Sequence, residues 1–513
     1  MKLTDCNAWR TLEAHYKVVK DISLKQLIAA TPDRFSIFSI EANNLLIDYS
    51  KNWITEETIH LLCALARERN LSPAIQALAA GENVNTSENR AAGHMALRST
   101  EKTEKAALAQ TELQKIKNLS EQLSRGELLG FSGKKIDTIL HIGMGGSGLG
   151  QILYYQALKS TKDSARCYFL TNYDDVEIQE TLADCDPEKS IVVVVSKSFS
   201  TRETVLIFEK AKHWLSQTVK NTAIQCYAVT EETACAQAQG FLPQHIFKLW
   251  DWVGGRYSIW SAASLSVILA LGFEKFSAFL RGAETMDQHF LTTPFEKNAP
   301  VIMGLLGVWY NNFFHAHTKA TIPYSAQLKS LPKYLQQLAM ESLGKTVNVR
   351  GETIEYATGR VVWGDVGPAS QHSFHQLLMQ GNHLIPVDFI LPLSDNNTDN
   401  LERSAFCLSQ SQTLLQGFQS TSEKTIPGNR PSTTILMRRL TPDTLGALIA
   451  CYEHSVFVQS VIWEINAFDQ WGVERGKVVA EQIMQALKAR EQRDEFDAST
   501  NGLLKKIIER MSH

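Results

Sequence analysis

The chain has 513 residues, of which 44% are hydrophobic and 20% are charged, and its formal net charge is −3. This length is too great for one hydrophobic core, so two or three domains are expected. The near-neutral charge gives no reason to expect nucleic acid or an anionic membrane as a partner. Any positive charge that meets an anionic substrate must therefore be concentrated locally.

The first residues lack the apolar core of a secretory signal peptide, which predicts a cytoplasmic protein. The most apolar segments, 258–273 and 445–468, are interrupted by polar residues. We interpret them as buried helices rather than membrane spans. The eight cysteines form no C-x-x-C pair and no cluster with histidines. This distribution indicates free thiols in a reducing compartment and argues against a structural zinc site.

Residues 1–80 are predicted to be mainly helical, because apolar residues recur there at helical spacing. The alternating segment 35–40 is typical of a short strand or an extended arm. Segment 101–125 is charged and rich in good helix formers, which predicts an exposed helix leading into the next domain.

From Ile136 onward, strand and helix patterns alternate. The predicted strands are 138–142, 167–170, 191–195, 224–229 and 246–250. Single helices between strands indicate a parallel sheet that is covered on both faces. Ligands of such folds bind at the carboxyl ends of the strands. Three distinctive loops fall at those ends: 143–147, 196–201 and 253–256.

A second α/β unit is predicted after Gly272. A long helix-rich stretch comes first, and strand-like segments then appear at 346–354, 359–365, 384–390 and 433–438. Strong helical patterns fill the gaps between them.

The segment Ile191–Thr204, IVVVVSKSFSTRET, is the clearest candidate for an anion site. Five β-branched residues predict a buried strand, and a hydroxyl-rich turn then enters a helix, whose first N–H groups favour an anion. The turn supplies four hydroxyl groups and one cation, from Ser196, Ser198, Ser200, Thr201 and Lys197. No Gly-rich Walker pattern is present, so a single phosphate on a small molecule is favoured over a nucleotide. An ordinary capped helix is the alternative.

Gly143-x-Gly145-x-x-Gly148 follows a predicted strand and matches the dinucleotide fingerprint, with Asp174 near the distance expected of a ribose-binding acid. A second interpretation is that the glycines let the backbone approach a sugar or phosphate, with Ser147 adding a hydroxyl. A glycine turn used only for packing is the third.

Two residues have charges suited to catalysis. Arg256 follows two glycines before a buried helix, as either a structural ion-pair partner or a cation aimed at a ligand. Glu341 lies one turn after Gln337 near the carboxyl end of a short helix that Gly344 ends. The helix dipole raises a carboxylate pKa there, as a general base requires. A solvated surface glutamate is the alternative.

His372 is predicted in the first turn of a helix ending at Gly381, where the dipole favours a neutral imidazole that exchanges a proton with a sugar oxygen. A capping histidine is the alternative. The segment 468–477 is predicted to be a polar turn, and Lys477 to begin the last major helix. There its charge opposes the dipole. A solvated surface lysine is the alternative.

Together these stretches resemble the glucose-6-phosphate isomerase (phosphoglucose isomerase) family, in the family's order, from about Asn83 to Lys477. The matching segments are GMGGSGLG, SKSFSTRET, VGGRYSIWS, YLQQLAMESLGK, QHSFHQLLMQG, GNRPS and IWEINAFDQWGVERGK. The resemblance implies an aldose–ketose isomerisation through a cis-enediol, without metal or organic cofactor.

The resemblance also assigns roles to residues. Glu341 moves the proton between C1 and C2, and Arg256 stabilises the enediolate. His372, from the neighbouring subunit of a homodimer, and Lys477 assist ring opening. The implied substrate-binding residues are Gly146, Ser147, Ser196, Lys197, Ser198, Thr201, Gly255, Gln337 and Gln470.

The family fold implies two α/β/α sandwich domains of the sugar-isomerase type with parallel-rich sheets, plus an N-terminal helical segment and a C-terminal helix. The corresponding division is an N-terminal segment (1–100), a smaller domain with the phosphate loop (101–275) and a larger domain with the catalytic base (276–513).

This chain departs from the family pattern around the sugar site: Gly148 and Gln151 replace Asp and Pro, Arg202 replaces a common Gln, Leu343 replaces Asn, and 367–370 reads GPAS. A nicotinamide-dependent oxidoreductase and a non-catalytic phosphosugar sensor are the rival functions. The first leaves Glu341 unexplained, and retention of every residue assigned a chemical role argues against the second.

Overall fold

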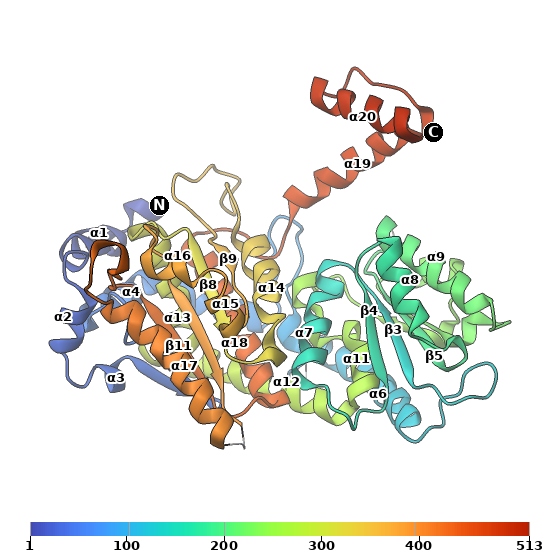
Figure 1. Cartoon of the computed structure of the whole chain (residues 1–513), viewed down its shortest axis with the longest axis horizontal. Coiled ribbons are helices and arrows are strands. Elements are labelled where there is room, and N and C mark those ends of the chain that lie inside the picture. Colours follow the sequence, from blue (N-terminus) through green and yellow to red (C-terminus); the bar gives the residue numbers. More distant parts are fainter. Residues whose placement is uncertain (1, 102, 200, 395–396, 512–513) are drawn as a thin grey trace. The chain divides into compact units, whose positions relative to one another are not determined.

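The computed structural model describes residues 2–101, 103–199, 201–394 and 397–511. It divides into two compact units, Met1–Ala467 and Phe468–His513. The first unit contains both β-sheets, and the second contains helices α19 (Trp471–Ala489) and α20 (Ala498–Met511) (Figure 1). The C-terminal helical segment that the resemblance implies is confirmed, and it consists of these two helices.

The first sheet has five strands in the order β4-β3-β5-β6-β7, and every neighbouring pair is parallel. Its strands are β3 (Thr138–Ile142), β4 (Arg166–Leu170), β5 (Ser190–Val195), β6 (Cys226–Thr230) and β7 (Ile246–Lys248). All five predicted strands are therefore confirmed, with boundaries that shift by a few residues. The helices of this region are α6 (Glu104–Ser124), α7 (Leu149–Leu158), α8 (Asp175–Ala183), α9 (Arg202–Ser216), α10 (Thr233–Ala238) and α11 (Leu265–Leu271).

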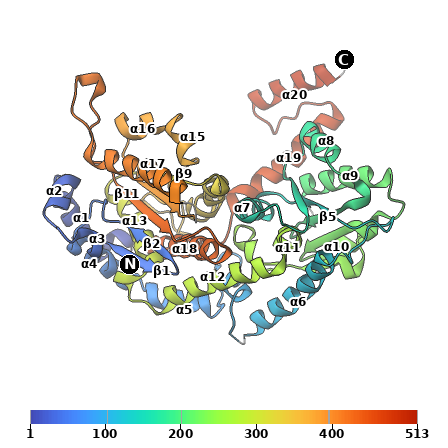
Figure 2. The ribbon, with the colours of Figure 1, turned by 60° about the horizontal axis from the view of Figure 1, so that its bottom comes forward.

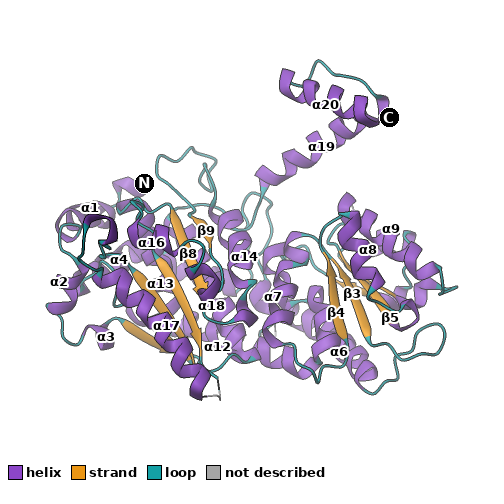
Figure 3. Cartoon of the chain, in the orientation of Figure 1, coloured by secondary structure: helices purple, strands orange, loops and turns teal. Residues whose placement is uncertain are grey.

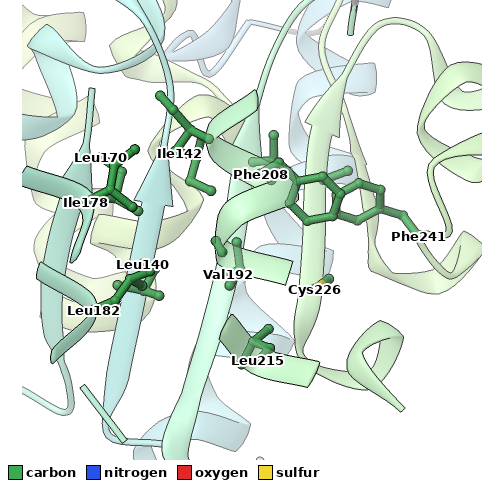
Figure 4. Packing of buried hydrophobic residues seen from close by; sticks show 14 of the residues in the cluster. Leu140, Ile142, Leu170, Ile178, Leu182, Val192, Phe208, Leu215, Cys226 and Phe241 are labelled. Atoms are coloured by element: carbon green, nitrogen blue, oxygen red, sulfur yellow. The ribbon is translucent and has the colours of Figure 1, made fainter. Parts of the chain in front are cut away.

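Strand β5 is buried along its whole length, because its β-branched side chains point to both covered faces of the sheet. On one face, Val192 and its neighbours pack against α8 and α9 in a continuous apolar cluster (Figure 4). Phe208 of α9 stacks on Phe241 with ring centroids 4.7 Å apart. This packing fixes the strand ends, and hence the loops that follow them.

The second sheet has six strands in the order β1-β2-β11-β10-β8-β9. Its strands are β1 (Ser39–Ala42), β2 (Leu45–Asp48), β8 (Thr318–Pro323), β9 (Val361–Trp363), β10 (Val387–Pro392) and β11 (Ser432–Met437). Four of them are parallel, and the β1–β2 hairpin adds an antiparallel edge. The first half of the alternating segment 35–40 belongs to helix α3 (Arg34–Ile37), and its strand starts only at Ser39. Segment 346–354 forms a single isolated bridge between Val347 and Thr353 instead of a strand.

Helices flank each sheet on both faces, which confirms the predicted α/β/α class (Figure 3). The remaining helices are α1 (Asn7–Val19), α2 (Leu24–Ala29), α4 (Glu56–Glu68), α5 (Leu71–Ala79), α12 (Phe273–Thr292), α13 (Ala299–Val308), α14 (Leu331–Gln336), α15 (Gly367–Gln371), α16 (His375–Gln380), α17 (Asn397–Gln416) and α18 (Pro442–Ile462). The predicted domain boundaries near residues 100 and 275 stay predictions.

Helix α18 is long and apolar enough to cross a membrane, but 94% of its apolar window is buried inside the protein. This burial confirms the predicted core helix. It packs along α12 (Figure 2), and two glycines permit the contact. A Cβ on Gly282 would overlap the backbone of Asp443, and one on Gly446 would overlap the carbonyl of Phe279. All eight cysteines are free, as predicted.

Candidate functional site

The carboxyl ends of the five parallel strands lie at one edge of the first sheet, as parallel pairing requires. Because β3 and β5 are neighbours, the glycine turn after β3 and the hydroxyl-rich turn after β5 both start from this edge. The loop after β7 leads to Gly254, Gly255 and Arg256. This is the edge at which open α/β sheets bind ligands.

The glycine turn packs directly against the loop after β7. Gly145 has a φ of 53°, and a Cβ on Gly146 would overlap the backbone carbonyl of Gly255. The hydroxyl of Ser258 donates to the Gly146 carbonyl at 3.3 Å. Glycine at 146 is therefore required by the approach of another part of the chain, as the packing interpretation predicted. The same contact keeps the half-buried Ser147 beside the Gly255–Arg256 loop.

His141, the next-to-last residue of buried strand β3, holds this glycine turn in place. Its Nε2 lies 2.7 Å from the Ser147 carbonyl and its Nδ1 lies 2.6 Å from the Ser266 hydroxyl. A neutral ring satisfies both, with Nε2–H donating to the carbonyl and Nδ1 accepting from the hydroxyl. Burial lowers the pKa of His141 to about 4. The sequence reasoning missed this residue, although a histidine within an apolar strand just before a glycine turn was a usable signal.

The turn after β5 is built by Ser196 and Phe199. The buried Ser196 hydroxyl accepts from the Phe199 amide at 3.1 Å, and Phe199 adopts a left-handed φ of 51°. Its ring is buried against Phe241, with centroids 5.5 Å apart. Thr201 is the N-cap residue of α9, but its side chain makes no capping hydrogen bond with a described residue. Ser198 lies exposed in the turn, and Ser200 lies outside the described residues.

Lys197 links this turn to the loop after β7. Its Nζ donates to the carbonyl of Asp251 at 2.8 Å and to that of Val253 at 3.2 Å. Burial lowers the pKa of Lys197, while Glu231, at 3.9 Å, opposes the shift. The lysine therefore carries local positive charge and also holds two loops of the ligand-binding edge together.

Arg256 is buried, and its guanidinium is held from several sides. Its Nε donates to the Ser342 hydroxyl at 2.7 Å, and its Nη2 donates to the Ala467 carbonyl at 2.5 Å. Its Nη1 lies 3.3 Å from a carboxylate oxygen of Glu341. Both interpretations of Arg256 are thus compatible: Arg256 forms an ion pair, and the carboxylate in this pair belongs to the predicted base, Glu341.

Glu341 lies at the end of a π-helical turn, Gln337–Glu341, that follows α14. Gln337 donates from Nε2 to Glu341 Oε2 at 3.0 Å, which confirms that the two side chains share a face. The sequence pattern predicted an ordinary short helix and missed the π-turn. Such turns occur frequently at functional sites. The Glu341 side chain is only 21% exposed, which argues against a solvated surface glutamate.

Ser342 is fully buried, and the Tyr257 hydroxyl lies 3.1 Å from its Oγ. Ser342 therefore connects Arg256 and Tyr257 with the segment that carries Glu341. The sequence reasoning did not single out Ser342 or Tyr257. Their adjacency to Glu341 and Arg256 in the chain was the only signal.

The structure corrects the predicted position of His372. Helix α15 ends at Gln371 and α16 begins at His375, so His372 follows one helix instead of lying in the first turn of another. Its amide donates to the Ala369 carbonyl and its side chain is exposed. The nearby His375 is buried, with contacts to Ser370 and Gln410.

Gln470 and Lys477 belong to the second unit. Gln470 is the N-cap residue of α19, and Lys477 lies in the second turn of that helix, where its Nζ contacts Glu474 at 2.9 Å. The predictions that 468–477 is a turn and that Lys477 begins a helix are therefore wrong. Glu474, one turn earlier in the same helix, compensates the positive charge of Lys477.

Asp174 has a local role. Its carboxylate caps α8 by accepting from the amides of Val176 and Glu177 at 3.0 and 3.2 Å. This capping role weakens the nicotinamide-nucleotide interpretation of the glycine turn, which needed Asp174 to bind a ribose.

Comparisons of sequence and of structure with known proteins identify relatives of the same family. The sequence profile of the family described as phosphoglucose isomerase matches residues 48–504. The glucose-6-phosphate isomerase of Coxiella burnetii (strain RSA 493) is 43% identical over 99% of this chain and 99% of its own length, and that of Chlorobium luteolum is 42% identical over 98% of each. The crystal structure of a glucose-6-phosphate isomerase from Chlamydia trachomatis has a TM-score of 0.88 and 30% identity, covering 99% of each chain. These matches confirm the predicted fold class.

The buried His141 predicts a pH dependence of stability. Its folded pKa of about 4 lies below the ordinary value of 6.5, so between these pH values the unfolded chain binds a proton that the folded chain does not. The free energy of unfolding therefore falls as pH falls through this window, by about 3 kcal/mol from this residue. Urea unfolding of wild type and His141→Gln across the window measures the difference, with the exposed His383→Gln as control. Parallel pH profiles for wild type and His141→Gln would contradict the assignment.

Proposed function

Because the chain belongs to the phosphoglucose isomerase family and is an aldose–ketose isomerase, we propose that it interconverts glucose 6-phosphate and fructose 6-phosphate through a cis-enediol intermediate. The observation that carries this proposal is the carboxylate of Glu341, held 3.3 Å from the Arg256 guanidinium and 3.0 Å from the Gln337 amide. Such a carboxylate is fixed in direction, and a cation lies beside the place where negative charge develops. The reaction belongs to glycolysis and gluconeogenesis.

The central step moves one proton between two carbons. Glu341 takes the proton from C2 of the open-chain aldose, the C1 carbonyl becomes an enediolate, and the same carboxyl returns the proton to C1. The proton of the C2 hydroxyl moves to the oxygen on C1, and the ketose forms with C2 oxidised and C1 reduced, so no external electron acceptor is required. Arg256 stabilises the enediolate, since its guanidinium is buried and its charge is poorly screened there.

Ring opening comes before this step and requires a proton to leave the C1 hydroxyl and another to reach the ring oxygen. We assign this exchange to His372 and Lys477, with His372 supplied by the neighbouring subunit of a homodimer. The exposed position of His372 supports the assignment, because it leaves the imidazole accessible to a second chain. Gln470, Gly255 and Gln337 are assigned to the sugar pocket.

The substrate phosphate is assigned to the turn before α9, with Ser196, Ser198 and Thr201 as donors. Helix α9 has 15 residues, and its first-turn amides and dipole favour an anion. Ser196 accepts from the Phe199 amide, so its own proton remains to be donated. Lys197, Gly146 and Ser147 complete the assigned set. The free thiols and the bacterial relatives support a cytoplasmic location.

Glu341→Gln tests the proposed base, because glutamine keeps the size of the side chain and cannot accept the proton. We expect kcat to fall by about 10²- to 10⁴-fold while the fold survives. A coupled assay that detects glucose 6-phosphate formed from fructose 6-phosphate measures the rate, and circular dichroism checks the fold. The exposed Glu402→Gln is the matched control. Turnover of Glu341→Gln at the wild-type rate would remove Glu341 from the mechanism.

A shared site in a homodimer predicts complementation between two inactive variants. When Glu341→Gln and His372→Ala dimers exchange subunits, each mixed dimer has one site with both defects and one site with neither. After random exchange about half of the dimers are mixed, so about one quarter of all sites are intact. The mixture should therefore reach up to about one quarter of the wild-type activity. Activity is measured after mixing, and fluorescent labels on the two variants report subunit exchange. Mixed dimers without activity would show that His372 acts within its own subunit or not at all.

Ser342 is expected to act as a positioning residue for Arg256. Ser342→Ala removes the acceptor for the guanidinium Nε, so we expect kcat to fall about 10- to 100-fold while KM changes little. Tyr257→Phe should give a smaller loss of the same kind, since it loosens the Ser342 hydroxyl. Steady-state kinetics separate kcat from KM, with the buried Ser264→Ala as control. An unchanged kcat, or an equal loss in the control, would contradict the positioning role.

A further inference from the structure

A small cavity lies at the N-terminal edge of the second sheet. Its volume is about 20 Å³, which is enough for one water-sized sphere. Lys319 and Asp388 are the second residues of the parallel strands β8 and β10, and Arg360 comes immediately before β9. The other polar side chains that line the cavity belong to Asn52, Tyr310 and Thr433.

Arg360 is the unusual member of this group. It is only 8% exposed, and no hydrogen bond or ion pair to its guanidinium is formed by the described residues, although the guanidinium nitrogens are accessible to a water-sized sphere. Burial lowers the pKa of Arg360 to about 10. A buried guanidinium has five N–H donors, and leaving them unpaired is costly.

A second buried arginine in the same region shows the ordinary solution. Arg34 is 3% exposed, and its Nε and Nη2 donate to the backbone carbonyls of Ser50, Asn52 and Ile54 at 2.7–2.9 Å. Three carbonyl dipoles thus pair the Nε and Nη2 donors of Arg34, whereas Arg360 faces the cavity without an equivalent. The difference between the two arginines indicates that the acceptor for Arg360 is not part of the described chain.

The charges around the cavity do not balance. The Asp388 carboxylate lies 2.5 Å from Lys319 Nζ and 2.8 Å from the Tyr452 hydroxyl, and its charge also raises the pKa of Arg360, so one carboxylate faces two cations. Arg360 then leaves one excess positive charge among the residues that line the cavity. Tyr310 adds to the excess of donors, because its hydroxyl accepts from the Trp53 amide and its own proton has no acceptor among the described residues.

From this geometry we propose that the cavity binds one small monovalent anion of the size of chloride, between Arg360 and Lys319, with the Tyr310 hydroxyl as a further donor. An acceptor with a single negative charge satisfies the unpaired donors and cancels the excess charge at once. A volume of about 20 Å³ suits a monatomic anion better than sulfate, phosphate or a phosphosugar. The anion is a structural counter-ion that ties the starts of β8 and β10 to the segment before β9.

This site is separate from the proposed function. Glu341 and His372 lie on segments that follow the carboxyl ends of β8 and β9, whereas the cavity lies at the opposite ends of those strands. The anion should therefore affect stability, with little effect on the isomerase rate. Failure of one proposal leaves the other intact.

Anomalous diffraction from wild-type crystals soaked in bromide tests the site directly. We expect an anomalous peak in the cavity, within hydrogen-bond distance of the Arg360 guanidinium, and no peak there for Arg360→Met. Density without an anomalous signal would mean that water fills the cavity and would overturn the proposal. This experiment needs only the wild-type protein, so it decides the matter even if the variant does not fold.

Thermal unfolding provides the solution test, at constant ionic strength with chloride replaced by the much larger gluconate. Once chloride exceeds its Kd, each tenfold increase should raise the wild-type Tm by about 1 °C. Arg360→Met should lose this dependence. Arg34→Met, which removes an arginine of similar burial, should be less stable yet keep the dependence. Equal chloride dependence in wild type and Arg360→Met would contradict the assignment.

Discussion

The ligand-binding edge depends on one buried guanidinium. Arg256 sits at the point where the loop after β7 meets the segment that carries the candidate base, and its three nitrogens contact Glu341, Ser342 and the Ala467 carbonyl. A buried charge must be paired or it destabilises the fold, so the contacts that keep Arg256 in place also aim Glu341. The pairing that stabilises Arg256 and the chemistry proposed for Glu341 therefore depend on the same interaction.

The two sheets bring complementary groups to this guanidinium. The first sheet provides the loops with hydroxyl groups, amides and Lys197, because its parallel strands place successive loops at one edge. The second sheet provides Glu341 through the segment after β8. Gly146 leaves no room for a Cβ against the backbone of Gly255, so the two loops touch there through their backbones. A larger residue at 146 would displace Arg256 as well, since the two are adjacent in that contact.

The sequence predicted those parts of the structure that local pattern determines. Five β-branched residues in a row identified β5, and the spacing of Gln337 and Glu341 identified a shared helical face. Prediction from the local pattern failed where long-range contacts determine the secondary structure. Strand β8 begins with polar Thr318 and Lys319 and reads as part of a helix-rich stretch, yet pairing with β10 and β9 makes it a strand. The π-turn before Glu341 and the helix break at His372 likewise depend on packing that periodicity does not encode.

Arg256 and Arg360 show how a buried cation can be interpreted. Both are buried, but Arg256 is paired with a carboxylate beside the ligand-binding edge, whereas Arg360 lines a cavity at the other end of the strands without an acceptor from the described chain. A carboxylate that can gain and lose a proton suits proton transfer. The neighbouring cation stabilises the negative charge that develops during the reaction. A fixed counter-ion suits a place where nothing reacts. The partner of each arginine, more than its burial, therefore distinguishes a chemical role from a structural one.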